Sequence, residues 1–361
     1  MNRNHDVHAV ARHFQIPGDL LRAESYGSGH INDTYCITAD HNGLPVRHIC
    51  QRINHAVFKD PNALMDNIRR VTEHLSGKLA GDPNRNRRTL TLIKTRDGNP
   101  FHRDSLGNYW RVYPFIEKAR SREAVESPQQ AFEAAKAFGQ FQRLLADLPA
   151  PRLHEIIPDF HHTPKRFIAL EKAIEADIAN RATLAKPEIE FALRHKHITS
   201  VLLDAKLPER VTHNDTKLNN VLLDDSTGEG ICVIDLDTVM PGSALYDFGD
   251  MVRTATSPAM EDERDLSKVE MQFPMFDALA RGYLASTSDF LTASEKQQMA
   301  FSGKLITFEI GIRFLADYLA GDTYYKVHRD HHNLDRCRVQ FKLMESIARR
   351  EARMNKLVET L

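Results

Sequence analysis

The segment 211–237, VTHNDTKLNNVLLDDSTGEGICVIDLD, constrains the fold of this chain more than any other. Its first part contains the pattern H-x-D-x-x-x-x-N, formed by His213, Asp215 and Asn220. The apolar runs NVLLDD and GICVIDLD follow, and because a short Ser-Thr-Gly turn separates them, they predict a β-hairpin. Asp235 comes at the end of the second run. The chain must therefore fold so that a polar loop leads directly into a hairpin with an aspartate at its far end.

The residue types in this pattern match what phosphoryl transfer requires. That reaction needs a carboxylate that orients the attacking hydroxyl and accepts its proton, and oxygen ligands that hold Mg²⁺ against the phosphates of a nucleotide. We expect Asp215 to be the base, and Asn220 and Asp235 to hold Mg²⁺. His213 is expected to brace the loop, and Lys217 to offset the charge of the transferring phosphate. An Asx-rich turn without a ligand is the alternative, but it explains neither the order of the motif nor the aspartate after an apolar strand.

The rest of the chain predicts two lobes around this segment. Its 361 residues are enough for about two domains. Strands are expected in the runs DTYCITAD, VRHICQRI, TLTLIKT and YWRVYPFI, with one helix that begins at Asp60-Pro61. Helices are expected over residues 128–147, 164–180, 186–204, 270–285, 293–319 and 333–358. We therefore expect an α+β chain with a small antiparallel sheet in residues 1–116, a helical lobe in residues 117–361 and a short hinge near 115–118.

Composition and charge exclude several classes of function. The formal net charge is −1, so no overall positive field exists that could hold a nucleic acid. No uninterrupted apolar stretch reaches about 18 residues, and the charged N-terminus lacks the apolar core of a signal peptide. The four cysteines lie far apart and predict free thiols in a reducing compartment. We expect a cytoplasmic protein that binds neither nucleic acid nor a membrane, with its oligomeric state left open.

The polar loop and Asp235 resemble the catalytic loop and metal-binding aspartate of the aminoglycoside phosphotransferase and choline kinase group, which are relatives of the protein kinases. Within that group, longer segments are similar to the N-acetylhexosamine 1-kinases: YGSGHINDTY, VTHNDTKLNNVL, VIDLDTVMPGSALYDFGDMVR and EIGIRFLADYLAGDTYY. The resemblance covers both expected lobes. It implies a two-lobed protein-kinase-like fold that binds ATP between the lobes. It also implies ATP- and Mg²⁺-dependent phosphorylation of the anomeric hydroxyl of N-acetylglucosamine or N-acetylgalactosamine.

A glycine-containing turn precedes the second expected strand. Two glycines spaced by one residue let backbone amides approach a phosphate closely, so Gly27, Ser28 and Gly29 are expected to cover the nucleotide phosphates. Without the polar loop downstream, a tight turn with no ligand would be the better interpretation. The other polar residues of the turn are expected to face the sugar or the phosphates: His30, Asn32 and Asp33.

The chain departs from the protein-kinase pattern on the third strand. That pattern carries a lysine that contacts the nucleotide phosphates, whereas the corresponding strand here reads HICQRIN. Arg52, or less favourably Gln51, would have to supply the contact, since an arginine binds phosphate with two donors. An exposed strand arginine without a ligand is an equally good interpretation. The expected acidic partner is Glu73, the only glutamate in the following helix.

The C-terminal helix and the turn after it contain the expected acceptor residues. On spacing alone, the arginine and tyrosines there fit ordinary helix packing. The resemblance implies that Arg313 and Tyr324 bind the sugar, because guanidinium donors bind ring hydroxyls or an acetamide oxygen and aromatic faces cover C–H surfaces. Weaker candidates lie nearby or in the segment PDFHHTP: Asp317, Tyr318, Tyr325, Phe160, His161 and His162.

Four further polar residues follow the hairpin. Asp247, Asp250 and Arg253 lie among apolar residues in SALYDFGDMVRT, so we expect them to cap helices or to hold the polar loop in place. Asp237 comes two residues after Asp235, and in an extended chain both would point to the same face. We therefore expect Asp237 to support the metal from behind Asp235.

Two classes of alternative function stay open. A related kinase could act on another small alcohol, such as an aminoglycoside, choline or homoserine, and the cationic acceptors among these call for an acidic or aromatic pocket. The missing strand lysine also leaves room for a nucleotide-binding or scaffold protein without activity. Mg²⁺-dependent ATP turnover stimulated by a sugar would exclude that second class.

Overall fold

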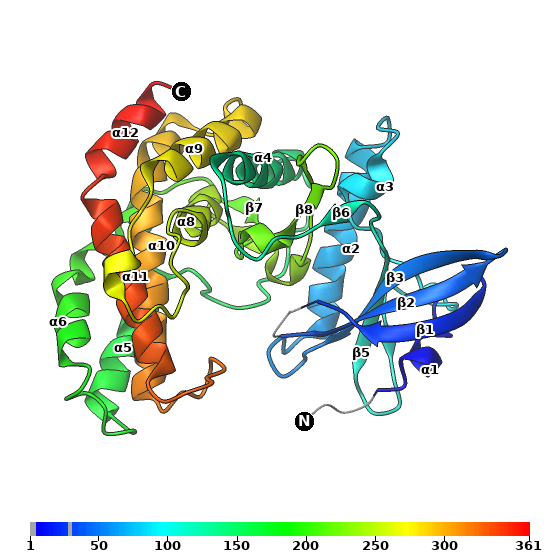
Figure 1. Cartoon of the computed structure of the whole chain (residues 1–361), viewed down its shortest axis with the longest axis horizontal. Coiled ribbons are helices and arrows are strands. Elements are labelled where there is room, and N and C mark those ends of the chain that lie inside the picture. The colour runs from blue at the N-terminus through cyan, green and yellow to red at the C-terminus, as the bar shows by residue number, and fades with distance from the viewer. Residues whose placement is uncertain (1–4, 28–30) are drawn as a thin grey trace.

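The structure is a computed structural model that describes residues 5–27 and 31–361. An antiparallel sheet and a larger helical lobe lie side by side (Figure 1). The five-stranded sheet has the order β1-β2-β3-β5-β4. Its strands are β1 (Asp19–Ser25), β2 (Asp33–His41), β3 (Leu44–Ile53), β4 (His102–Arg103) and β5 (Tyr109–Pro114). The expected α+β architecture is therefore confirmed.

Two helices pack near this sheet, one before its first strand in the sequence and one after its third. Helix α1 (Val7–Ala11) covers the sheet around Trp110 in a small separate core. Helix α2 (Pro61–Lys78) begins as the sequence predicts, because Asp60 accepts hydrogen bonds from the backbone amides of Asn62 and Ala63 and Pro61 occupies the first turn. Its apolar face packs into the large core that it shares with the helical lobe. Helix α2 therefore connects the two lobes through apolar contacts.

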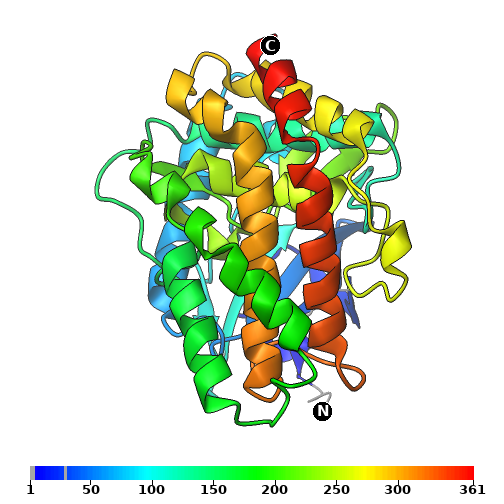
Figure 2. The same cartoon turned by 90° about the vertical axis from the view of Figure 1, so that its left-hand side faces the viewer.

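The helical lobe is built around the long helix α10 (Ala293–Leu319). A capping box between Thr292 and Glu295 begins α10. Helix α11 (His332–Ala348) runs along it (Figure 2), and α5 (Thr163–Ala176), α8 (Ala244–Ala255) and α12 (Glu351–Glu359) also contact it. Helix α4 (Pro128–Leu144) packs on α9 (Phe273–Thr287). The remaining helices are α3 (Arg85–Arg88), α6 (Lys186–Arg194) and α7 (Val201–Asp204).

The predicted hairpin lies between the lobes. Strands β8 (Val221–Asp224) and β9 (Gly230–Val233) form it, and β6 (Ala119–Arg120) pairs with β8. Before and after the hairpin, β7 (Arg210–Thr212) and β10 (Met240–Gly242) pair with each other. A side chain at Gly230 would meet the backbone oxygen of Glu133 at 2.6 Å, so the close packing of β9 on α4 requires glycine there. The hairpin is thereby fixed against the helical lobe.

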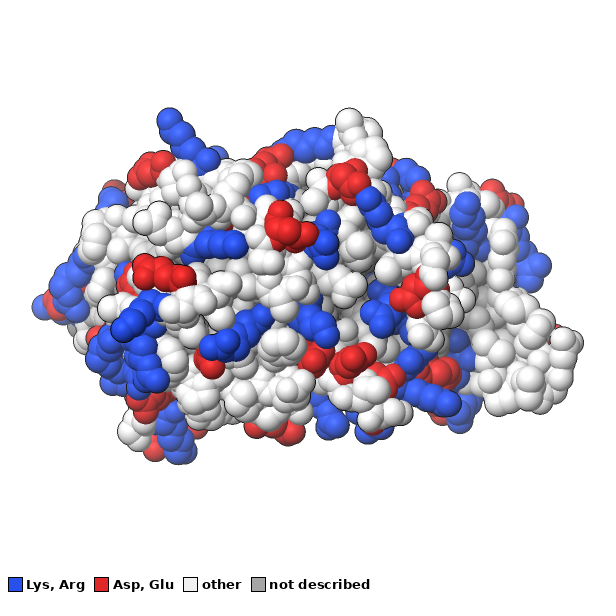
Figure 3. All heavy atoms as spheres, turned by 90° about the horizontal axis from the view of Figure 1, so that it is seen from above, with Lys and Arg blue, Asp and Glu red and all other residues white. Residues whose placement is uncertain are grey.

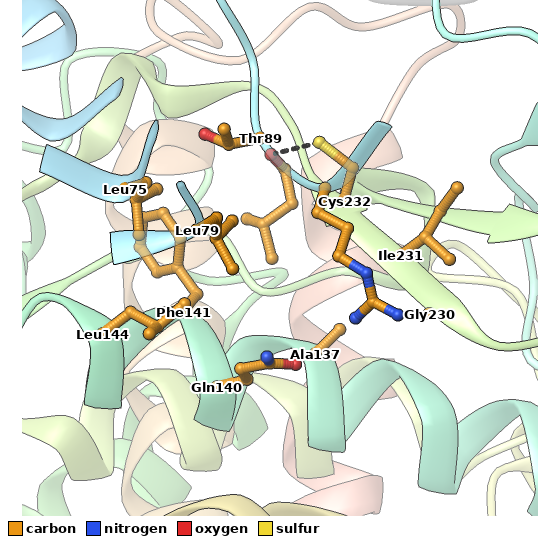
Figure 4. Close-up of a pocket in the computed structure, with 12 residues that line it drawn as sticks. Leu75, Leu79, Thr89, Ala137, Gln140, Phe141, Leu144, Gly230, Ile231 and Cys232 are labelled. Atoms are coloured by element: carbon orange, nitrogen blue, oxygen red, sulfur yellow. Dashed lines mark hydrogen bonds between the residues drawn. The ribbon is translucent and has the colours of Figure 1, made fainter. Parts of the chain in front are cut away.

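A cavity of about 30 Å³ lies where α2, α4 and β9 meet (Figure 4). Apolar side chains of Leu75, Leu79 and Phe141 line it, together with Cys232, whose thiol donates to the carbonyl of Val233 at 3.5 Å. A space of this size holds about one water molecule. The residues that line this partly open pocket join α2 to α4 and β9 of the helical lobe.

Three sequence expectations differ from the structure. The run TLTLIKT (89–95) is irregular rather than a strand, although the amide of Ile93 donates to the carbonyl of Val112 at 2.9 Å. The helix expected over 186–204 is divided into α6, a 3₁₀ turn at Lys196–Ile198 and α7. The helix expected over 333–358 is divided into α11 and α12. In each case the apolar pattern is correct, but periodicity alone does not report where a backbone turn interrupts an element.

Charged side chains of both signs are distributed over the surface seen in Figure 3. Seen from above, basic and acidic side chains are interspersed over both lobes (Figure 3). Within residues 5–27 and 31–361, none of the helices has both the length and the apolar character that a membrane crossing requires.

Candidate active site

The loop that follows β7, residues 213–217, is held by its own histidine. The Nε2 atom of His213 lies 2.9 Å from the carbonyl oxygen of Ile234, and its Nδ1 accepts the backbone amide of Asp215 at 3.3 Å. The first contact connects the loop to the end of β9. Since Nδ1 acts as the acceptor, Nε2 carries the proton. His213 therefore braces the loop, as expected from the sequence.

Two buried carboxylates of α8 fix the backbone of the same loop. Asp247 accepts the amides of His213 and Asn214 at 2.9 and 2.7 Å. Asp250 accepts the amide of Thr216 at 2.9 Å and is paired with Arg253. Burial raises the pKa of Asp247, against the effect of these donors. The expectation that these residues hold the polar loop agrees with the contacts.

Asp215 projects from this loop with a basic and an amide partner. Lys217 Nζ lies 2.9 Å from its carboxylate, and Asn220 Nδ2 donates to its backbone oxygen at 2.8 Å and its carboxylate at 3.2 Å. Removal from water would raise the pKa of Asp215, but Lys217 and other cations hold that pKa below its usual value. The side chain stays 31% exposed. Asp215 is therefore an ionised and accessible carboxylate at neutral pH.

Asp235 lies directly after β9 in a left-handed backbone conformation, with φ of 58°. This conformation is uncommon for a residue with a side chain. The residue is exposed to solvent, yet desolvation by the surrounding protein, and then the charges of Asp237 and Asp215, raise the pKa of Asp235 to about 6. Carboxylates that repel one another in this way fit a divalent cation, which would relieve the repulsion. Because the amide nitrogen of Asn220 faces Asp215, its Oδ1 is the atom that it would present to such a cation.

Asp237 connects the two lobes. The chain turns into a 3₁₀ segment (Leu236–Thr238) after Asp235, so the two aspartates do not share the face of an extended strand. Asp237 is instead buried, paired with Arg111 of β5 and hydrogen-bonded to the side-chain amide of Asn32. Asn32 also accepts the backbone amide of Asn54 at 3.0 Å. The sheet and the segment that carries Asp235 are therefore joined by an ion pair and an amide.

Arg313 lies on α10 with only 11% of its side chain exposed. Its guanidinium stacks over the ring of Phe160 at 5.0 Å from the centroid and lies 3.8 Å from Glu309. Glu309 is completely buried and bonds to His161 at 2.9 Å and to Thr163 at 2.6 Å. The other ring nitrogen of His161 lies 3.4 Å from the carbonyl of Asn214, next to Asp215. Glu309 and His161 therefore connect the helix of Arg313 to the polar loop.

Asp317 shapes the turn that carries Tyr324. Its carboxylate accepts the amides of Thr323, Tyr324 and Tyr325 at 2.9, 2.8 and 3.0 Å. The ring of Tyr325 lies 4.6 Å from that of Phe314, while Tyr324 is 62% exposed. The turn therefore presents Tyr324 to solvent from a fixed backbone. Among the weaker candidates, His162 caps α5 by accepting the amide of Lys165.

A protein-family model matches more than half of this chain. Residues 22–278 match the model of the phosphotransferase enzyme family, APH. The chain belongs to this phosphotransferase family. The match includes most of the sheet, the 213–217 loop, the hairpin and α8, so Asp215, Asn220 and Asp235 lie within it, whereas α10 with Arg313 lies beyond it.

Solved structures with the same fold include several small-molecule phosphotransferases. An aminoglycoside phosphotransferase from Alicyclobacillus acidocaldarius is 15% identical, with a TM-score of 0.62, over 98% of this chain and 96% of the other. A spectinomycin phosphotransferase in complex with ADP and spectinomycin is 15% identical, with a TM-score of 0.55, over 98% and 97%. A choline kinase from Cryptosporidium parvum is 16% identical, with a TM-score of 0.53, over 98% and 95%. At such identities the likeness shows the kinase-like fold of this phosphotransferase.

Arg52 is paired within its own hairpin in the structure. Its Nε and Nη2 atoms lie 2.6 and 2.5 Å from one oxygen of Asp33, directly across the β2–β3 hairpin. Glu73 forms a surface pair with Arg69 on α2. Among the described contacts, Arg52 and Glu73 each find a partner on their own hairpin or helix.

Part of the glycine turn lies outside the described residues. Ser28, Gly29 and His30 belong to that part. Gly27 is described with φ of 78°, a conformation that favours glycine, and open space surrounds the position of a Cβ. Tyr26, the preceding residue, closes the hairpin by donating to the carbonyl of Thr34 at 2.9 Å.

Sequence reasoning missed two buried residues that contact the candidate site residues. Arg111 is buried in the centre of the run WRVY, and an arginine within an apolar strand was the available signal. Glu309 lies in the apolar helix EIGIRFL, four residues before Arg313, where a buried carboxylate requires partners. Neither signal identifies the partner, since Asp237 and His161 are more than a hundred residues away.

Proposed function

We propose that this phosphotransferase transfers the γ-phosphoryl group of ATP to the anomeric hydroxyl of an N-acetylhexosamine and releases the sugar 1-phosphate. The arrangement of Asp215, Asn220 and Asp235 at the junction of the lobes carries the proposal. Residues 1–116 would form the nucleotide-binding lobe, with Gly27, Ser28 and Gly29 over the phosphates. Residues 117–361 would carry the base and the acceptor side. The resemblance to N-acetylhexosamine 1-kinases supports the choice of acceptor.

In this proposal Asp215 orients the acceptor hydroxyl. Its pKa is below the usual value, so it is a weak base and takes the proton only as the new phosphorus–oxygen bond forms. Lys217 lies beside Asp215 and would offset charge on the transferring group. Asn220 and Asp235 would hold Mg²⁺, which neutralises phosphate charge when it is bound. The backbone bonds from Asp247 and Asp250 keep the loop in place, so catalysis depends mainly on positioning.

The charges on the acceptor side favour a neutral acceptor. Arg313 and Arg166 lie close enough that Arg313 lowers the pKa of Arg166, after the larger effect of burial. Glu309 is already satisfied by His161, Thr163 and Arg313. A cationic acceptor would meet this positive charge, whereas a sugar would use the guanidinium as a hydrogen-bond donor. This argument favours an N-acetylhexosamine over choline or an aminoglycoside.

An acceptor panel tests the proposal. ADP release with Mg²⁺ and ATP would be followed for N-acetylglucosamine, N-acetylgalactosamine, glucose, choline, homoserine and an aminoglycoside. We expect the highest kcat/KM for an N-acetylhexosamine. Turnover with only a cationic alcohol would retain the kinase and overturn the acceptor. Arg281, which forms a surface pair with Asp277 on α9, provides a control site for the variants below.

Replacing Arg313 by alanine should affect the acceptor and leave the nucleotide unaffected. Loss of a charged hydrogen bond costs about 1.5–3 kcal/mol, so we expect kcat/KM for the sugar to fall about 10- to 100-fold, with KM for ATP within about threefold of wild type. Arg281→Ala should change neither value. A rise in KM for ATP equal to the rise for the sugar would contradict a role on the acceptor side. Initial-rate kinetics with each substrate varied in turn measure both effects.

Binding of the metal nucleotide should depend on pH through Asp235. Its pKa of about 6 is above the usual aspartate value, so the ligating charged form is present above pH 6 and is lost as the pH falls through 6. We expect the affinity for MgADP to decrease about tenfold per pH unit below 6, and ADP in EDTA to lack this decrease. Titration calorimetry between pH 5 and 8 measures both. The same pH dependence with and without Mg²⁺ would exclude Asp235 as its cause.

A further inference from the structure

The guanidinium of Arg111 is buried at the junction of the lobes. Only 1% of its side chain is exposed. Arg111 lies on β5 directly opposite Gln51 on β3, and its Nε donates to Gln51 Oε1 at 3.0 Å. Its Nη1 pairs with Asp237, two residues after Asp235. A strand of the sheet therefore places a cation against the segment that carries the candidate metal ligand.

The charge of Arg111 is retained in this environment. Burial alone would lower the pKa of the guanidinium, but Asp237 and Asp235 raise that pKa above its usual value. In turn, Arg111 acts to lower the pKa of Asp235. Because Arg111 and Asp237 are buried, their charges act more strongly on one another than they would at the surface. Arg111 is therefore electrostatically coupled to both aspartates of the segment.

The two positions where the protein-kinase pattern places its charged pair are occupied differently here. That pattern has a lysine on the third strand and a glutamate on the following helix. On β3, Gln51 is neutral and hydrogen-bonded to Arg111, and Arg52 is paired with Asp33. On α2, Glu73 is paired with Arg69 at the surface. The cation is found on the neighbouring strand β5, as Arg111, and its acidic partner in the segment after β9, as Asp237.

We propose that Arg111 supplies, from β5, the positive charge that balances the nucleotide phosphates, with Asp237 as its acidic partner. This inference rests on the proposed nucleotide site. Arg111 acts as a positioning residue: it fixes Asp237 and holds a positive charge beside Asp235. An arginine suits this place because its planar fork bonds Gln51 and Asp237 at the same time, which a lysine ammonium does with less geometric control.

The double variant Arg111→Gln/Asp237→Asn tests the proposal without leaving a buried charge unpaired. It removes one positive and one negative charge, so the net charge is unchanged and we expect a melting temperature within about 5 °C of wild type. Binding of a fluorescent ADP analogue is measured with Mg²⁺ and separately in EDTA. If the charge of Arg111 balances the phosphates, affinity falls at least about tenfold in both conditions. If the pair is only structural, affinity in EDTA stays within about threefold of wild type, and the proposal is wrong.

A matched control and a rescue variant complete the test. Arg87 also bridges the lobes, through Asp224 at 2.8 Å and the carbonyls of Glu117 and Lys118, so Arg87→Gln removes a bridging arginine outside the site. It should change ADP affinity less than about threefold. Arg111→Gln/Gln51→Lys returns a cation to β3 and should recover at least half of the lost affinity, on a logarithmic scale. An affinity as weak as that of the double variant would overturn the proposal.

The outcomes also separate this inference from the proposed function. If the wild-type protein bound neither ADP nor MgADP, the nucleotide site itself would be wrong. If the wild type binds nucleotide and the Arg111→Gln/Asp237→Asn variant binds it equally well, only the role of Arg111 is wrong.

Discussion

Replacing Asp215 by asparagine is expected to lower kcat by about a thousandfold while leaving the affinity for MgADP within about threefold of wild type. Asparagine has nearly the same shape, so it retains the packing of the loop, but it cannot accept the proton of the acceptor hydroxyl. The backbone of residue 215 would remain bonded to Asn220 and to the ring of His213. Single-turnover kinetics and nucleotide binding measured on the same preparation give both quantities.

The matched control is Asp225→Asn. Asp225 lies in the turn of the same hairpin and is paired with Arg120 at 2.6 Å, away from the 213–217 loop. Its replacement should leave kcat within about twofold of wild type, because exposed ion pairs contribute little. Asp215→Asn with nearly normal turnover would remove Asp215 as the base, whatever the control shows.

Replacing Asp235 by asparagine should weaken the binding of MgADP without lowering the stability of the free protein. Because the pKa of Asp235 is raised to about 6, the charged form that predominates at neutral pH costs the folded protein free energy that it does not cost the unfolded chain. Removing that charge should leave the melting temperature of the free protein equal or higher. The stabilisation by MgADP should largely disappear, whereas for the wild type a ligand at 100 times its dissociation constant adds about 2.7 kcal/mol.

Thermal unfolding at pH 7.5, with and without MgADP, measures both parts of this prediction. Asp225→Asn again serves as the control, with the full MgADP shift. If Asp235→Asn kept the wild-type shift, the metal role of Asp235 would be refuted, and Asp215 and Asn220 would have to hold Mg²⁺ without it.

The local part of the fold could be predicted from the sequence. The cap at Asp60-Pro61, the helix over 293–319 and the hairpin between β8 and β9 depend on residues close in the chain, and all three appear as expected. The run TLTLIKT was assigned wrongly because its alternation satisfies a strand pattern. Whether such a run pairs with a neighbour depends on tertiary contacts that the pattern does not contain.

In the candidate site, too, contacts between residues close in sequence could be predicted, and contacts between distant residues could not. The order of His213, Asp215 and Asn220 brings these residues together within one loop, so their proximity follows from the sequence. The partner of a strand arginine does not follow. Arg52 and Arg111 both lie on strands of the sheet. The register of the β2–β3 hairpin places Arg52 opposite Asp33, whereas Arg111 pairs with Asp237 because the two lobes approach each other there. The pairing of Arg111 depends on the distance between elements that are far apart in sequence.

The position of the phosphate on the product tests the central claim most directly. The wild-type protein would be incubated with ATP, Mg²⁺ and N-acetylglucosamine or N-acetylgalactosamine, and the product examined by phosphorus NMR with coupling to the sugar protons. We predict a phosphate coupled to the anomeric proton, as in a sugar 1-phosphate, and its absence with Asp215→Asn over the same time. A phosphate on another hydroxyl, or no sugar phosphate at all, would contradict the account.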